Sequence, residues 1–196
     1  MKKRFASVHR KTRETDIRVE LYLDGRGQTA IRTGLPFLDH MLELLGRHSL
    51  IDLAVAAKGD LKVDYHHTVE DIGLALGAAL NQALGDRVGI RRYGAGAVPM
   101  DEALARVVVD LGGRPYLVKE MVCRKKRILD FDLSLFDDFF QSLVVQSRMN
   151  LHIDQVRGVE AHHAWESVFK ALARALRMAC EVDPRERCVP SSKGRI

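Results

Sequence analysis

The feature that most constrains the fold is an order of segments that occurs twice along the chain. The first half offers strand-like RFASVHRKT and TDIRVELYLDG, a helix over LPFLDHMLELLGRHS, then LIDLAVAA and a second helix. The second half offers strand-like ALARVVVDLG and RPYLVKEMV, a helix over LFDDFFQSLVVQSR, then NLHIDQV and a long helix over HHAWESVFKALARALRMAC. Alternation with period two is typical of strands, and apolar recurrence at i, i+3 and i+4 is typical of helices. The chain is therefore predicted to be an internally duplicated α+β protein.

An overlay of the two halves sets particular residues opposite each other. FLDHM lies on FFQSL, and RHSLID lies on RMNLHID. In this overlay His40 falls opposite Ser142, and His152 falls opposite Ile51. Each half thus contributes one histidine that the other half lacks.

The overlay also predicts where the two repeats meet. A boundary near residues 93–98 gives a first α+β repeat over residues 1–95 and a second over residues 96–196, together forming one compact unit. Within the first repeat, a turn at Gly59-Asp60 is predicted to lead into a short alternating strand, LKVDY. The helix after the first histidine pair is expected from Thr68 onward.

The composition excludes several classes of protein. No apolar run approaches the ~18 residues of a membrane span, and MKKRFASVHRKTRET lacks the apolar stretch of a secretory signal. Three scattered cysteines, Cys123, Cys180 and Cys188, are typical of reduced thiols in a cytoplasmic protein. The densest basic cluster of this chain, whose net charge is +5, is CRKKR, and the acidic DFDLSLFDD follows it at once. A charge-balanced loop or strand is favoured there, so neither nucleic acid nor membrane is predicted as a partner.

Two histidine pairs are each followed by a glutamate in the same frame. HHTVE runs from His66 to Glu70 and HHAWE from His162 to Glu166, in a chain with only 8 histidines. One such match is expected about 0.02 times by chance, so a shared role is favoured. On a helix the first histidine and the glutamate share a face, whereas the adjacent second histidine points elsewhere. Each pair is therefore expected to serve two metal ions, or one metal ion and the substrate.

Eight side chains form the predicted set of metal ligands. Six imidazoles and two carboxylates divide into two sites of three histidines and one glutamate, which suit Mn, Fe, Co or Zn rather than Mg or Ca. The paired motifs carry this prediction, because His40 on an amphipathic helix also fits a packing role and His152 in a strand also fits simple exposure. The eight are His40, His66, His67, Glu70, His152, His162, His163 and Glu166.

With these residues assembled, the chain resembles the imidazoleglycerol-phosphate dehydratases of histidine biosynthesis along essentially its whole length. The resemblance is carried by collinear stretches: RKTRETDI, TGLPFLDHML, RHSL, GDLKVDYHHTVEDIGLALG, GIRRYG, VPMDEALARVVVDLGGRPYLV, NLHI, HHAWESVFKALARALR and PSSKG. One departure is Glu160, which stands two residues before the second histidine pair where the family usually has asparagine. A carboxylate there is close enough to the ligands to change the hydrogen bonding around a metal. The tail reads PSSKG where PSTKG is common, a milder change.

The resemblance implies the ribosomal protein S5 domain 2-like fold, in which each half packs a four-stranded sheet against helices. It also implies a cytoplasmic homo-oligomer of 24 subunits, with active sites at subunit contacts and two Mn²⁺ ions per active site. The eight ligands then need not converge within one chain, because neighbouring subunits supply some of them.

The implied reaction removes water from D-erythro-imidazole glycerol phosphate and gives imidazole acetol phosphate. Metal ions on the ring nitrogens would stabilise an imidazolate, which can expel the hydroxyl through a diazafulvene-like intermediate. By resemblance Glu14 contacts the substrate and handles the proton transfer, and the catalytic set also holds His40, His66, Glu70, His163 and Glu166. By the same resemblance, the substrate phosphate is bound by guanidinium, hydroxyl and ammonium groups. These belong to Arg92, Arg114, Ser191, Ser192 and Lys193.

Two other functions fit parts of the sequence. A dinuclear metallohydrolase could use the HHxxE motifs to activate water, although such a site needs an open ligand position. Release of phosphate instead of loss of water would support it. A basic RNA-binding protein with structural metals would show salt-dependent RNA affinity that survives chelation. We therefore predict a hydro-lyase, with the metallohydrolase as the alternative.

Overall fold

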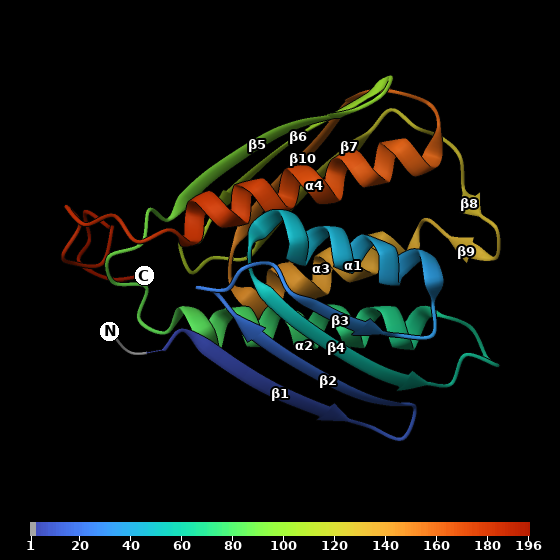
Figure 1. Cartoon of the computed structure of the whole chain (residues 1–196), viewed down its shortest axis with the longest axis horizontal. Helices are drawn as coiled ribbons and strands as arrows, with labels where there is room; N and C mark the ends of the chain where they lie inside the picture. Colours follow the sequence, from blue (N-terminus) through green and yellow to red (C-terminus); the bar gives the residue numbers. More distant parts are fainter. Residues whose placement is uncertain (1–2) are drawn as a thin grey trace.

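Two four-stranded sheets enclose a layer of helices in the computed structural model, which describes residues 3–196 (Figure 1). The first half contains β1 (Phe5–Lys11), β2 (Thr15–Tyr22), β3 (Thr29–Arg32), α1 (Pro36–Ser49), β4 (Asp52–Gly59) and α2 (His66–Leu84). The second half contains β5 (Tyr93–Met100), β6 (Ala103–Asp110), β7 (Tyr116–Met121), α3 (Leu135–Ser147), β10 (Asn150–Arg157) and α4 (Ala161–Cys180). A hairpin of β8 (Arg127–Ile128) and β9 (Phe131–Asp132) precedes α3.

The two halves share one topology. The sheet orders are β1-β2-β4-β3 and β5-β6-β10-β7. In both sheets the third strand along the chain pairs in parallel, β3 with β4 and β7 with β10, and the other pairs are antiparallel. The predicted duplicated α+β fold, with a four-stranded sheet in each half, is confirmed.

The core lies between the sheets, where α1 packs on α4 and α2 packs on α3. Alternate residues of the strands face this core. Ile17 and Val19 of β2 and Val107 and Val109 of β6 are fully buried. Four phenylalanines fill the centre: Phe136, Phe139, Phe140 and Phe169. Burial of each contributes about 1.5–3 kcal/mol. This packing holds all four helices parallel or antiparallel to one another, with the histidine-bearing ends of α2 and α4 at the same end of the molecule.

The predicted overlay of α1 on α3 is wrong. The buried residues of α1 (Leu38, Met41, Leu42, Leu45, Gly46, Ser49) recur at the same spacing in α3 (Phe136, Phe139, Phe140, Leu143, Val144, Ser147), where Ser142 is buried in addition. Each helix then ends in a left-handed residue, Leu50 or Arg148. By this match His40 corresponds to Asp138 and not to Ser142. The overlay matched residues of similar type, whereas the pattern of buried residues and the ends of the helices show which positions are equivalent.

The same correction applies to His152. Tyr22, the last residue of β2, pairs with Asp52 at the start of β4, just as Asp110, the last residue of β6, pairs with Asn150 at the start of β10. His152, the third residue of β10, therefore corresponds to Ala54 and not to Ile51.

The predicted strand LKVDY is also wrong, because residues 61–63 form a turn and α2 begins at His66. The amide of Val63 donates to the carbonyl of Asp60, and the Val63 side chain is 70% exposed. The segment alternates in sequence, but it does not pair with a neighbouring strand. Gly59 lets the end of β4 lie close to the start of α2, since a Cβ there would lie 1.9 Å from Thr68 Oγ1.

Strand β5 was not recognised from its sequence, YGAGAVPM, since glycine and proline are rare in strands. The structure gives the reason for its glycines. A Cβ on Gly94 would lie 2.0 Å from the carbonyl oxygen of Ala175, and one on Gly96 would lie 2.3 Å from that of Ala171. The glycines thus let α4 lie directly on the sheet.

Residues 85–92 connect α2 to β5, and β5 lies wholly in the second sheet. The division into residues 1–95 and 96–196 stays a prediction of where the duplicated units join. Within residues 3–196 no helix is long and apolar enough to cross a membrane. The three cysteines lie in this described part and are free, with Cys123 and Cys180 buried and Cys188 exposed.

Candidate active site

The clearest constellation joins α1 to α4. His162 and Glu166 share a face of α4, one turn apart, and His40 reaches them from α1. Glu166 Oε2 lies 3.3 Å from His162 Nε2 and 3.7 Å from His40 Nε2. Among the described residues these three form the one group whose ligand atoms all lie within 4.8 Å of each other. Three of the predicted ligands thus converge within a single chain.

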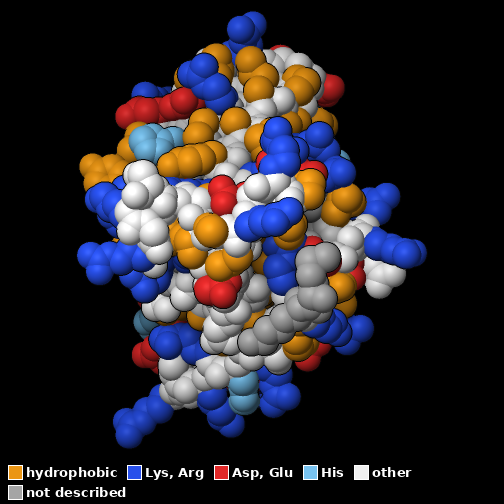
Figure 2. Space-filling model, turned by 90° about the vertical axis from the view of Figure 1, so that its left-hand side faces the viewer, with side chains coloured by type: hydrophobic (Ala, Val, Ile, Leu, Met, Phe, Trp, Pro, Cys, Tyr) orange, Lys and Arg blue, Asp and Glu red, His pale blue; other side chains and the backbone are white. Residues whose placement is uncertain are grey.

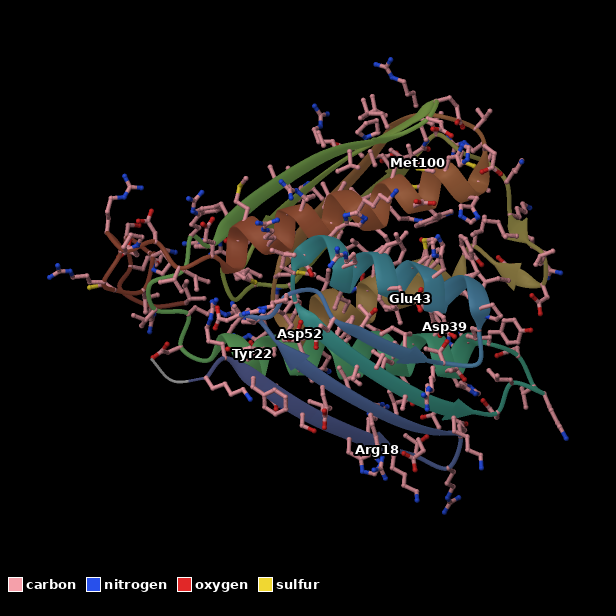
Figure 3. All side chains as sticks on the ribbon, viewed as in Figure 1. Arg18, Tyr22, Asp39, Glu43, Asp52 and Met100 are labelled. Carbon is pink, nitrogen blue, oxygen red and sulfur yellow. The ribbon has the colours of Figure 1, made fainter. Side chains whose placement is uncertain are left out.

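Glu166 is also held by a lysine that the sequence analysis missed. Lys170 Nζ lies 2.5 Å from Glu166 Oε1 and 3.5 Å from Met100 Sδ, at the end of β5 above α4 (Figure 3). Burial raises the pKa of Glu166, but the hydrogen bond and charge of Lys170 outweigh burial, with help from His40 and His162, and the net pKa is lowered. The carboxylate is therefore ionised, as a metal ligand must be. The i,i+4 spacing in WESVFK was the available signal.

The first histidine pair has a related arrangement at the start of α2. His66 Nε2 lies 3.8 Å from Glu70 Oε2, and His66 Nδ1 lies 3.2 Å from Asp138 Oδ2 on α3. Asp138 stands where His40 stands in the other half. Each half thus places one side chain beside the HHxxE motif of the opposite half. The first half contributes a histidine, and the second half contributes an aspartate. Asp138 was not predicted as a site residue.

An aromatic row separates the two motifs. The ring of Phe37 lies 5.5 Å from that of His162 and 5.7 Å from that of Phe131, which in turn lies 6.5 Å from Tyr65, the residue before α2. The rings thus form a continuous row of contacts from Tyr65, next to the first motif, to His162 in the second.

The second histidine of each pair points away from the first and meets carboxylates of its own. His67 Nδ1 lies 3.0 Å from Asp60 Oδ2 and 3.8 Å from Glu14 Oε2. His163 Nδ1 lies 2.8 Å from Glu102 Oε2. The hydrogen bond to Asp60 raises the pKa of His67, and the hydrogen bond to Glu102 raises the pKa of His163.

Glu160, the departure from the family pattern, caps α4. Its side chain accepts a hydrogen bond of 2.9 Å from the amide of His163, and Lys125 lies 3.6 Å away. The hydrogen bond from His163 lowers the pKa of Glu160, and a carboxylate at a helix N-terminus is favourable. Asparagine is a strong N-cap residue as well, so this exchange preserves the local role.

His152 does not join any of these groups. It is exposed on the outer face of β10, between Val108 of β6 and Val118 of β7, while its neighbours Leu151 and Ile153 are buried in the core. The side chain of His152 therefore points into solvent, away from the core of its own chain.

The predicted phosphate-binding residues lie at the opposite end of the molecule from the histidine motifs. Arg92 donates to both oxygens of Asp110, at 2.6 and 3.0 Å, and to the carbonyl of Pro190, at 2.8 Å. Arg92 therefore fastens the C-terminal segment that bears Ser191, Ser192 and Lys193, of which Ser192 and Lys193 are exposed. Arg114 is exposed at the same end. Lys and Arg side chains are spread widely over this end (Figure 2).

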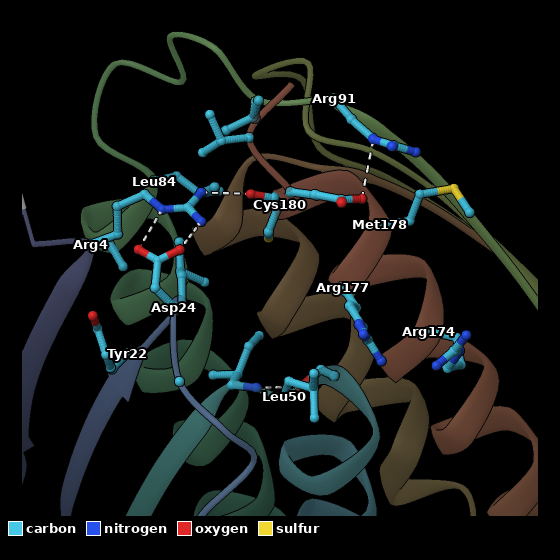
Figure 4. Close-up of a pocket in the computed structure, with 18 of the residues that line it drawn as sticks. Arg4, Tyr22, Asp24, Leu50, Leu84, Arg91, Arg174, Arg177, Met178 and Cys180 are labelled. Atoms are coloured by element: carbon cyan, nitrogen blue, oxygen red, sulfur yellow. Dashed lines mark hydrogen bonds and ion pairs between the residues drawn. The ribbon is translucent and has the colours of Figure 1, made fainter. Parts of the chain in front are cut away.

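The 20 residues of α4 separate this basic end from the histidine motifs, a span of about 30 Å at 1.5 Å per residue. The same end also has a wide groove between the two halves (Figure 4). Arg4 is fixed there by Asp24 and by the carbonyl of Cys180, and Arg91 pairs with Glu181. No histidine lines this groove within the described residues, so it does not coincide with the predicted ligands.

Comparisons with known proteins agree with the resemblance. The sequence profile described as imidazoleglycerol-phosphate dehydratase matches residues 33–176. The chain belongs to the imidazoleglycerol-phosphate dehydratase family. The dehydratases of Thioalkalivibrio sulfidiphilus (strain HL-EbGR7) and Acinetobacter baumannii (strain AYE) are both 55% identical to it over 197 residues, covering 100% of this chain and 100% and 98% of theirs.

Solved structures of the family share the fold. The Staphylococcus aureus N315 dehydratase has a TM-score of 0.83 and 38% identity, covering 91% of this chain and 99% of that one. The Pyrococcus furiosus structure has a TM-score of 0.83 and 36% identity, covering 96% of this chain and 100% of that one. Family membership confirms the predicted enzyme class, a hydro-lyase.

Proposed function

We propose that this chain removes water from D-erythro-imidazole glycerol phosphate to give imidazole acetol phosphate, a step of histidine biosynthesis in the cytoplasm. Family membership over the whole chain supports the reaction, and the convergence of His40, His162 and Glu166 is the single structural observation that carries it. The metallohydrolase remains the alternative, although nothing in the geometry favours it over the dehydratase.

The chain's own side chains fit a divalent cation. A buried, ionised carboxylate with two half-buried imidazoles within 4.8 Å is a donor set for Mn, Fe, Co or Zn, and Mn²⁺ is our choice, two per active site. The ligands proposed are His40, His66, His67, Glu70, His152, His162, His163 and Glu166. When bound, the cations supply Lewis acidity to the imidazole ring of the substrate.

The remaining residues have separate tasks. Glu14 is proposed to move the proton of the glycerol chain, since its carboxylate is exposed in the turn between β1 and β2, beside His67. Arg114, Ser191, Ser192 and Lys193 are proposed to hold the phosphate. Arg92 shares that task chiefly by fixing the tail, because Asp110 and Pro190 already occupy its guanidinium.

The separation of these groups supports an active site assembled from several copies of the chain. His152 faces outward from the second sheet, and the phosphate group lies a helix length from the histidine motifs. A homo-oligomer with sites at its contacts, proposed to have 24 subunits, brings these groups together.

The test combines metal content with water-loss activity on imidazole glycerol phosphate, before and after chelation. Two manganese ions per chain, and activity that returns when Mn²⁺ is added back, are the expected result. Release of inorganic phosphate without water loss would favour the metallohydrolase. Absence of any bound metal would refute the ligand set.

A further inference from the structure

The turns that precede β2 and β6 carry equivalent glutamates. Strands β2 (Thr15–Tyr22) and β6 (Ala103–Asp110) have the same length and the same place in their sheets. Glu14 and Glu102, the residues just before them, therefore correspond. Each also lies beside the second histidine of its own half, Glu14 beside His67 and Glu102 beside His163.

The two glutamates differ in what they can still do. In the first half, Asp60 takes the Nδ1 atom of His67 at 3.0 Å, and Glu14 stays 3.8 Å away without a hydrogen bond to it. In the second half, β10 carries a register irregularity between Gln155 and Arg157, and the two residues that follow the strand are Gly158 and Val159. Neither of these two residues carries a carboxylate, and Glu160 accepts from the backbone amide of His163. Glu102 is the carboxylate that binds Nδ1 of His163, at 2.8 Å.

We propose that Glu102 is a positioning residue for the dehydration, and that it does for His163 what Asp60 does for His67. A carboxylate on Nδ1 fixes the tautomer and the ring angle, so that Nε2 is presented to a metal ion. This inference rests on the proposed function, because it takes His163 as a ligand. It also explains why Glu14 can serve in proton transfer: Asp60, and not Glu14, holds the ring of His67, whereas Glu102 must hold the ring of His163.

The surroundings of His163 agree with this assignment. Glu102 Oε1 accepts from the amide of Glu160 at 3.3 Å, so both of its oxygens are used and its position is fixed from two sides. On the Nε2 side, the facing group is Asp101 Oδ2, at 3.8 Å, and that side chain is 74% exposed and can turn away. Nε2 is therefore the ring atom left for a cation.

The equivalent positions allow a matched test with Glu102→Ala and Glu14→Ala. Mn²⁺ is titrated into each full-length protein, and free Mn²⁺ is followed by electron paramagnetic resonance. Glu102→Ala is expected to raise the Kd for Mn²⁺ about 10–100-fold. Glu14→Ala is expected to leave it unchanged, because Asp60 still holds His67, while abolishing turnover. Glu102→Gln, which keeps an oxygen acceptor for Nδ1–H, is expected to restore most of the affinity.

Thermal unfolding of the metal-free variants separates positioning from support of the helix terminus. A lower Tm with an unchanged Kd for Mn²⁺ in Glu102→Ala would overturn the proposal and leave Glu102 a structural residue. Equal losses of affinity in Glu14→Ala and Glu102→Ala would overturn the division of tasks. If the unsubstituted protein bound no Mn²⁺, the proposed function itself would fail, which is a distinct outcome.

Discussion

Replacing Lys170 by methionine tests how much the ion pair with Lys170 stabilises the buried carboxylate of Glu166 when no metal is bound. The Lys170 and Glu166 side chains are only 19% and 9% exposed, and their charged atoms lie 2.5 Å apart. A hydrogen bond to a charged group contributes about 1.5–3 kcal/mol. Because each kcal/mol shifts Tm by about 2–4 °C in a domain of this size, Lys170→Met is expected to lower the Tm by about 3–12 °C in the presence of a chelator.

The pH dependence of this loss has a defined sign. The folded-state pKa of Glu166 is lowered, with burial opposing and Lys170 leading the groups that lower it. The ionised pair therefore stabilises the fold above the unfolded pKa of glutamate, and its contribution is lost as pH falls through the folded pKa. The Tm difference between the variant and the unsubstituted protein is expected to be full at pH 7 and to shrink in acid.

Manganese is expected to narrow the Tm difference at pH 7. A cation beside Oε2 of Glu166 replaces the positive charge that Lys170 supplied, and a ligand at 100 times its Kd stabilises the folded state by about 2.7 kcal/mol. The gain is expected to be larger in Lys170→Met, because the lysine no longer repels the cation. Differential scanning calorimetry with and without Mn²⁺ measures both effects, and Lys58→Met, at an exposed site on β4, is the control. If Mn²⁺ left the Tm difference unchanged, the idea that Lys170 and the metal ion both stabilise the carboxylate of Glu166 would be refuted.

Three further results are expected. Arg114→Ala weakens substrate binding without altering metal content, because Arg114 lies at the basic end away from the histidine motifs, and altered manganese stoichiometry would contradict this. His163→Ala loses both metal and assembly, and native mass spectrometry showing an intact, metal-loaded 24-mer would contradict that link. One thiol per chain reacts with a disulfide reagent at pH 8, because Cys188 is exposed whereas burial raises the pKa of Cys180 to about 12. Rapid loss of two or more thiols in the native protein would count against this.

The sequence predicted most of the fold because local patterns carried it. Alternating β2 and β6 and the apolar stripe of α4 were recognisable, and so was the duplication. The errors arose where the signal was not local. Strand β5 owes its glycines to contact with α4, and LKVDY alternates without any partner strand. Pairing and close approach are properties of the assembled layers.

The site shows the same division between local and distant information. HHxxE spacing predicted that His162 and Glu166 share a helical face, and the structure confirms it. The partners that fix the histidines could not be predicted, because Asp60, Glu102 and Asp138 lie 7, 61 and 72 residues from the histidines they meet. A carboxylate becomes a partner of a histidine only through the fold.

Duplication explains why these partners come in unequal pairs. Two copies of one unit, packed through α1 on α4 and α2 on α3, place each HHxxE motif beside a side chain from the other half. That side chain is His40 in one case and Asp138 in the other, and within residues 3–196 only the second motif forms a three-residue cluster with its ligand atoms within 4.8 Å of one another. The other motif has Asp60 and Glu14 beside His67, at 3.0 and 3.8 Å from its Nδ1 atom. One scaffold, used twice, thus gives the second motif a three-residue cluster and the first motif an exposed glutamate, and these are the two parts that the proposed metal-assisted loss of water would use.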